Sequence, residues 1–173
     1  MKRKQTGILS ACLAGLLMMA GSGCTMIEEA SKKTVGTDIR IEDITEFYYT
    51  EDGSSFPPYF QRYRFYAEAG KYAFSHETRE GDHWPLTQDD ATVTGTLSLS
   101  EEEWAGFFEY LKDGTVTKRE DDFSAGDDGP WLYLYWKNDR DSWQVFAFAS
   151  YSRLKDFETY CESLRERQLG EAR

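Results

Sequence analysis

Apolar and polar residues alternate along much of the middle of the chain. A period of two is typical of β-strands that have one covered face. In residues 59–67, one face carries Tyr59, Gln61, Tyr63, Phe65 and Ala67, and the other carries Phe60, Arg62, Arg64 and Tyr66. Similar patterns predict strands over residues 41–50, 72–78 and 142–149, and another strand that contains Val93, Leu97 and Leu99. Residues 131–136 are apolar or aromatic at nearly every position, which predicts a central strand.

Two segments have the period of an amphipathic helix instead. Ser100 and Glu103 form the sequence of a capping box, and they stand directly before an apolar stripe. The stripe consists of Trp104, Phe107, Phe108 and Leu111, and Gly114 is expected to end this helix. A second stripe near the C-terminus consists of Leu154, Phe157, Cys161, Leu164 and Gln168.

The predicted order is therefore β-β-β-β-α-β-β-α. The short polar connections between strands, such as residues 68–71, indicate hairpins. We predict an α+β fold, an antiparallel sheet of about six strands with both amphipathic helices packed on one face. This single domain is expected to span residues 39–169, with a C-terminal tail over 170–173.

The N-terminus has a different character from the rest of the chain. Lys2, Arg3 and Lys4 form a basic start, and an uncharged, mostly apolar run over residues 7–20 follows them. Small residues then lead into Cys24. A basic start, an apolar run and small residues before a cleavage point are typical of a secretory signal peptide, here residues 1–23.

The small residues before Cys24 resemble the lipobox of bacterial lipoproteins. The resemblance implies cleavage before Cys24, a diacylglyceryl group on its sulfur, and an extracytoplasmic protein held to the cell membrane by lipid. Cys12 fits the letters of the lipobox better, but it leaves too short an apolar run before it. Secretion without lipid and an uncleaved membrane anchor remain alternatives. The polar residues 25–38 predict a flexible tether after Cys24, so that residues 24–38 hold the lipid and the linker.

The mature chain would be strongly acidic. The full sequence carries a net charge of −11, and the signal peptide holds three of its 20 basic residues and none of its 31 acidic ones. The remaining 150 residues would therefore carry a charge of −14. Such a chain repels phosphate backbones, which argues against a nucleic-acid partner. Cys161 would be the one unmodified cysteine, and its place on an apolar helix stripe predicts a buried, unreactive thiol.

The candidate metal ligands do not form a recognised pattern. His76 and His83 are the two histidines, and we expect both to lie at the surface of a polar loop. Residues 120–129 are acidic and could surround a calcium ion, but their spacing differs from that of an EF-hand loop. No catalytic motif is present, and we predict no cofactor and no bound metal.

Aromatic residues are the remaining feature that bears on function. The mature part holds all 27 aromatic residues, and several strands carry them on both faces. Some of these side chains must then be exposed or covered by loops, and exposed aromatic patches mark interaction sites. We predict a binding surface that contains Tyr48, Tyr59, Tyr63 and Tyr133.

The predicted function is a non-catalytic binding module for an envelope protein or a cell-wall glycan. The alternative is an extracytoplasmic hydrolase that uses a pair of carboxylates not marked by any motif. The mature chain resembles small uncharacterised lipoproteins of Gram-positive anaerobes, a resemblance that implies no particular activity.

Overall fold

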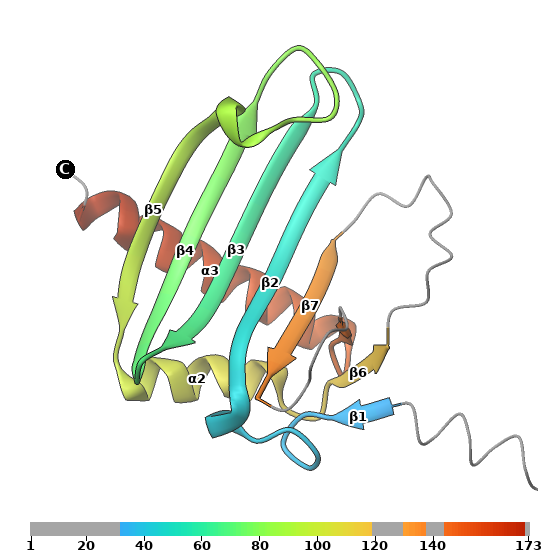
Figure 1. Ribbon diagram of the computed structural model, residues 1–173, viewed down its shortest axis with the longest axis vertical. Coiled ribbons are helices and arrows are strands. Elements are labelled where there is room, and N and C mark those ends of the chain that lie inside the picture. The colour runs from blue at the N-terminus through green and yellow to red at the C-terminus, as the bar shows by residue number, and fades with distance from the viewer. Residues whose placement is uncertain (1–31, 119–129, 138–143, 172–173) are drawn as a thin grey trace, which may run out of the picture. The chain divides into compact units, whose positions relative to one another are not determined.

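The computed structural model describes residues 32–118, 130–137 and 144–171. Eight strands of these segments form one antiparallel sheet in the order β1-β6-β8-β7-β2-β3-β4-β5 (Figure 1). The strands are β1 (Lys32–Thr34), β2 (Ile44–Gly53), β3 (Tyr59–Glu68), β4 (Lys71–Glu80), β5 (Ala91–Leu99), β6 (Thr115–Lys118), β7 (Trp131–Trp136) and β8 (Gln144–Ala147). The helices are η1 (Ile41–Asp43), η2 (Gln88–Asp90), α2 (Glu101–Leu111) and α3 (Tyr151–Glu171), where η marks a 3-10 helix.

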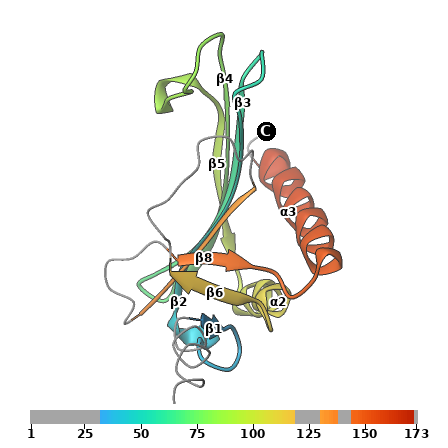
Figure 2. The ribbon, with the colours of Figure 1, turned by 90° about the vertical axis from the view of Figure 1, so that its right-hand side faces the viewer.

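The predicted α+β class is confirmed. The sheet is antiparallel, and Figure 2 shows α2 and α3 on the same side of it. The predicted number of about six strands is wrong, because β1 and β6 also belong to the sheet. These two strands have three and four residues, which is too short for an alternating pattern to show. β8 pairs mainly with β6 and shares one register pair with β7, the strand that precedes it in the sequence.

The long strands β2 to β5 follow one another as a meander. The turn between β3 and β4 consists of Ala69 and Gly70, since Glu68 and Lys71 are register partners. Both turn residues have positive φ, as a two-residue hairpin turn of type I′ requires. The hairpin predicted at residues 68–71 is therefore confirmed.

The predicted capping box at the start of α2 is also confirmed. The backbone N–H of Glu103 donates to the Ser100 hydroxyl at 3.2 Å, and the Ser100 N–H donates to the Glu103 carboxylate at 2.7 Å. At the other end, Asp113 takes the left-handed conformation that we expected of a glycine. Gly114 has another role, because a Cβ there would lie 2.5 Å from the Phe146 ring and 2.8 Å from the Leu111 carbonyl oxygen.

The core lies between the sheet and the two helices and is largely aromatic. Phe65 of β3 stacks on Phe107 of α2 with ring centroids 4.1 Å apart. Phe157 of α3 is fully buried and contacts both rings. Aromatic side chains bury large apolar areas, so this cluster explains how the two helices are held on one face of the sheet.

The tether predicted over residues 24–38 extends too far. β1 begins at Lys32 and pairs with β6, and the chain then buries Val35 and Ile39. The Val35 N–H also donates to the Gly114 carbonyl at 2.9 Å. The described part of the domain therefore begins at Lys32 and ends with α3 at Glu171, whereas the predicted domain spans residues 39–169. The predicted signal peptide, residues 1–23, lies outside the described residues, and so do residues 24–31 of the predicted tether.

Candidate binding face

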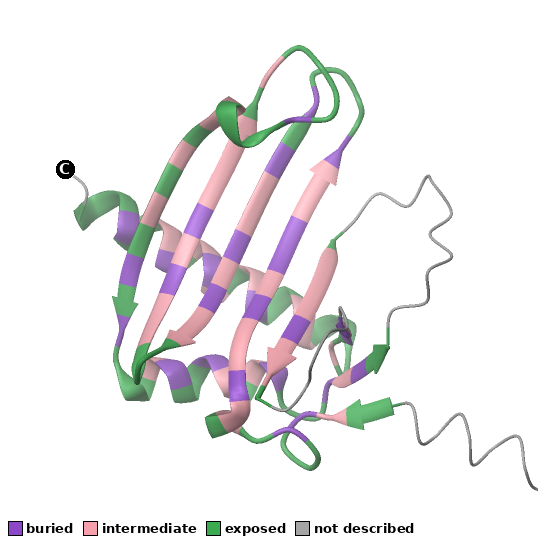
Figure 3. Cartoon of the chain, viewed as in Figure 1, coloured by how far each residue is buried: buried purple, intermediate pink, exposed green. Residues whose placement is uncertain are grey.

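The helices α2 and α3 cover one face of the sheet, and among the described residues no α-helix lies on the other face, which we call the open face (Figure 2). Cross-strand pairing places alternate residues of β2, β3, β4 and β7 on it. Most of its side chains are half-buried, as the pink bands of the long strands show in Figure 3. The open-face residues of the central strands are Glu46, Tyr48, Thr50, Asp52, Phe60, Arg62, Arg64, Tyr66, Ala73, Ser75, Glu77, Arg79, Trp131, Tyr133 and Tyr135.

Arginine side chains lie over aromatic rings along this face. The Arg62 guanidinium is 4.9 Å from the Phe60 ring centroid and 5.4 Å from that of Tyr48. The Arg64 guanidinium is 4.4 Å from the Tyr66 ring and 5.7 Å from the Tyr48 ring. Such cation–π contacts contribute roughly 0.5–1 kcal/mol each at exposed sites. Together these side chains form a layer in which the arginine guanidinium groups lie over aromatic rings of the same sheet face.

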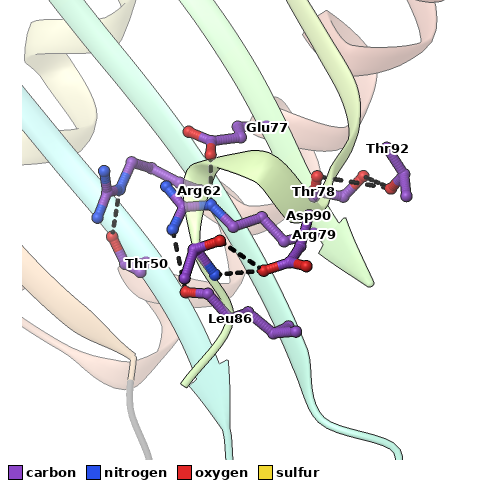
Figure 4. A network of polar contacts seen from close by, with 9 residues as sticks. Thr50, Arg62, Glu77, Thr78, Arg79, Leu86, Asp90 and Thr92 are labelled. Atoms are coloured by element: carbon purple, nitrogen blue, oxygen red, sulfur yellow. Dashed lines mark hydrogen bonds and ion pairs between the residues drawn. The ribbon is translucent and has the colours of Figure 1, made fainter. Parts of the chain in front are cut away.

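Polar contacts fix the same side chains laterally. Arg64 forms an ion pair with Glu46, and the Tyr48 hydroxyl donates to Glu46 at 2.7 Å. Burial and this hydrogen bond to a carboxylate raise the pKa of Tyr48 to about 12, so the phenol stays protonated. Arg62 Nε donates to the Thr50 hydroxyl at 3.1 Å (Figure 4). The tyrosine and arginine orientations are therefore set before any ligand binds.

The loop between β4 and η2 closes one end of the open face. Arg79 pairs with Glu77 at 2.6 Å and donates to the Leu86 carbonyl at 3.3 Å, as Figure 4 shows. The Arg79 guanidinium also lies 4.2 Å from the ring centroid of Phe60. Phe60 and Leu86 are both buried, so this loop shields one end of the open face from water. The rest of the face, around Tyr48 and Arg64, is the candidate binding area.

Two of the four predicted binding tyrosines lie on the open face. Tyr48 and Tyr133 are cross-strand partners there, and both are half-buried. Tyr59 is 47% exposed, but it stands at the end of β3 and has the strand parity of the helix-covered face. Tyr63 is 2% exposed and lies under α3, so its assignment to an exposed surface is wrong. Alternation in sequence shows which residues share a face, but it does not show which face the helices cover.

The helix-covered face holds its own polar groups. The Tyr63 hydroxyl donates to Glu162 of α3 and accepts from Gln61 at 2.9 Å. The Tyr49 hydroxyl lies 2.8 Å from a carboxylate oxygen of Glu51 and 2.9 Å from one of Glu158 of α3, and its single proton is shared between them. Burial and these carboxylates raise the pKa of both phenols. The two tyrosines therefore connect the sheet to α3, which is a structural role.

The two histidines occupy different environments. His83 lies in the exposed loop, as predicted, and pairs with Asp90 at 3.1 Å. His76 does not lie at the surface: it is 3% exposed, and its ring stacks on that of Tyr63 at 5.1 Å. Burial and the nearby Arg165 lower the pKa of His76 to about 4. The sequence prediction failed here because His76 continues the alternation of β4, with Phe74 before it.

The described residues offer few other chemical sites. Cys161 is buried, as predicted, and burial raises the pKa of its thiol. Among residues 32–118, 130–137 and 144–171, no three histidine, cysteine, aspartate or glutamate side chains gather as a metal site. Within the same segments, no helix has the length and apolar character to cross a membrane. Cys24 and the acidic residues 120–129 lie outside the described part of the chain.

No protein-family model, curated protein or solved structure matches this chain. Its function must therefore be argued from its own residues.

Sequence reasoning missed the arginines of the open face. The signal was present in the alternation of Phe60, Arg62, Arg64 and Tyr66, which share a strand face. Arg79 gave no such signal, because the predicted strand ends at residue 78, whereas β4 continues to Glu80. Two arginines between two aromatic residues on one strand face are the pattern that could have identified this array.

Proposed function

We propose that the protein is a membrane-anchored extracytoplasmic lipoprotein that acts as a non-catalytic binding module, and that the open face binds its partner. An envelope protein or a cell-wall glycan is the partner class. The observation that carries the proposal is the array of arginine and aromatic side chains on the sheet face opposite α2 and α3.

The chemistry of this array suits binding. Tyrosine and arginine give large, flat contact areas with polar edges, and they are enriched among the residues that dominate interface energies. Their orientations are fixed by Glu46 and Thr50, which lowers the entropic cost of ordering them on binding. Two open-face carboxylates, Glu46 and Glu77, are each paired with an arginine, so they help to hold the array.

The anchor part of the proposal rests on the N-terminal sequence. The basic start, the apolar run and the small residues before Cys24 support export and lipidation. A diacylglyceryl group supplies two chains, and two chains are what stable membrane anchoring requires. With a net charge of −14, the mature chain has no electrostatic attraction to anionic lipid of its own.

The test compares binding by the wild-type protein and by Tyr48→Ala. Binding to purified cell-wall glycan and retention of envelope proteins are measured separately, on protein immobilised through its N-terminus. Loss of one central aromatic contact should weaken binding by about 2 kcal/mol, which is ~30-fold. Tyr151→Ala is the matched control, because Tyr151 is 73% exposed on α3, away from the open face. Equal binding by wild type and Tyr48→Ala, with an intact fold, would contradict the proposal.

A further inference from the structure

β5 forms a long edge of the described sheet. β5 is the last strand in the sheet order, and none of the described strands pairs with its outer side. It has nine residues, none of them charged and none of them proline. The opposite edge strand, β1, has three residues, two of which are lysines. Proteins usually protect an edge strand by shortness, charge or proline, and β1 shows two of these devices whereas β5 shows none.

The two faces of β5 would suit an added strand. On the open side it presents a row of exposed hydroxyl side chains, Thr94, Thr96 and Ser98. Cross-strand pairs of threonine with threonine or serine are favourable in antiparallel sheets. On the other side, Leu97 and Leu99 are buried in the core. An incoming strand that alternates polar and apolar residues would continue both surfaces.

The C-terminal end of α3 extends beyond this edge. A Cβ on Gly95 of β5 would lie 2.2 Å from Gln168 Nε2, so α3 passes directly beneath the strand at this point. The last residues of α3 then emerge past β5 (Figure 1). Leu169 lies in this overhanging turn and is 38% exposed. The overhang therefore offers apolar contact to the covered face of a strand added next to β5.

The charges at the two ends of β5 indicate what kind of strand fits. Asp89 precedes β5, and Glu101 and Glu102 follow it, and all three are exposed. In an antiparallel pair of two copies centred on Gly95, the η2 end of each β5, which carries Asp89, would approach the α2 end of the other, which begins at Glu101. Like charges would then meet at both ends of the pair, which disfavours self-association. Basic residues at both ends of a foreign strand would instead be attracted.

From the edge, the overhang and these charges, we propose that β5 binds an extended segment of a partner protein by strand addition. The segment has an uncharged, β-forming middle and basic residues at both ends. The backbone of β5 supplies the main hydrogen bonds, as in other cases of strand addition. This site is separate from the arginine and aromatic array of the open face.

The test uses a labelled peptide of alternating valine and threonine with two lysines at each end. We expect it to bind and to protect the amide hydrogens of every second residue of β5 from exchange, since alternate amides face the free edge. The same peptide with glutamates at its ends should bind about tenfold more weakly at low ionic strength. Thr96→Lys should abolish binding, and Thr96→Val, the matched control at the same exposed position, should retain it.

Several results would overturn the proposal. Equal binding of the two peptides would remove the role of the terminal charges. Protection without the alternate pattern, or loss of binding in Tyr48→Ala, would place the peptide on the open face. Concentration-dependent dimers in sedimentation, with β5 protected in the absence of peptide, would make a second copy of this chain the occupant.

Discussion

Protonation of His76 should destabilise the protein as the pH falls from about 6.5 to about 4. The ring is 3% exposed, and neither of its nitrogens has a hydrogen-bond partner among the described residues. It faces Tyr63 from β3 and the charged groups Arg165 and Glu162 from α3, and Glu77 neighbours it on its own strand. A proton on His76 would place a buried positive charge beside Arg165.

The magnitude follows from the two pKa values. The pKa of His76 is about 4 in the folded protein, against an ordinary value of 6.5 for an unfolded chain. Between these values the unfolded state binds more protons, so the free energy of unfolding decreases as the pH is lowered. The full difference corresponds to about 3 kcal/mol, and about 2 kcal/mol of it is lost between pH 7 and pH 5.

The assay is urea denaturation at pH 7 and pH 5 of the wild-type protein, His76→Phe and His83→Gln. His76→Phe keeps an aromatic ring against Tyr63 and cannot take up a proton, so it should lose about 2 kcal/mol less than wild type. His83→Gln is the control, because His83 is the other histidine and lies in an exposed loop. Titration of carboxylates affects all three proteins alike and cancels in the comparison. An equal loss in wild type and His76→Phe would show that folded His76 accepts a proton freely.

Three further predictions concern α2 and the N-terminus. Trp104→Ala should lower the free energy of unfolding by roughly 3–5 kcal/mol, because the ring is buried and stacks on Tyr72 at 4.7 Å. Ser100→Ala should lower it by ~1 kcal/mol, because the helix loses its N-cap. Urea denaturation of both variants would check that Trp104→Ala is the more destabilising. Gly114→Ala should lower the melting temperature because its Cβ would meet a phenylalanine ring at 2.5 Å, whereas Gly106→Ala, with no atom within 4 Å, should raise it. Intact mass of membrane-extracted protein should show a chain that begins at Cys24 and carries diacylglycerol; a mass that includes residues 1–23 would contradict lipidation.

The sequence was most informative where local rules decide the structure. The capping box of Ser100 and Glu103 fixed the start of α2, and the alternation in residues 59–67 assigned every side chain of β3 to the correct shared face. These patterns depend on neighbouring residues alone. The end of α2 was harder, because Asp113 took the left-handed position that a glycine usually occupies.

Long-range pairing accounts for most of what was missed. β1 and β6 are stabilised by each other and by β8, partners that are distant in the sequence. The burial of Tyr63 and His76 depends on where α3 lies, which no local pattern records. The candidate site was consequently predicted in part: Tyr48 and Tyr133 lie on the open face, but the arginines that surround Tyr48 were not recognised.

The position of β1 has a mechanical consequence. On the proposed lipid anchor, any force between the membrane and a bound partner enters the domain at Lys32. It then acts first on a strand held by three register pairs to β6 and by the buried Val35 and Ile39. Detachment of residues 32–39 would lengthen the connection to the membrane by about 28 Å at full extension, while the long strands β2 to β5 and the core beneath them stay folded. β1 would thus act as an extensible element that yields under load before the binding surfaces do.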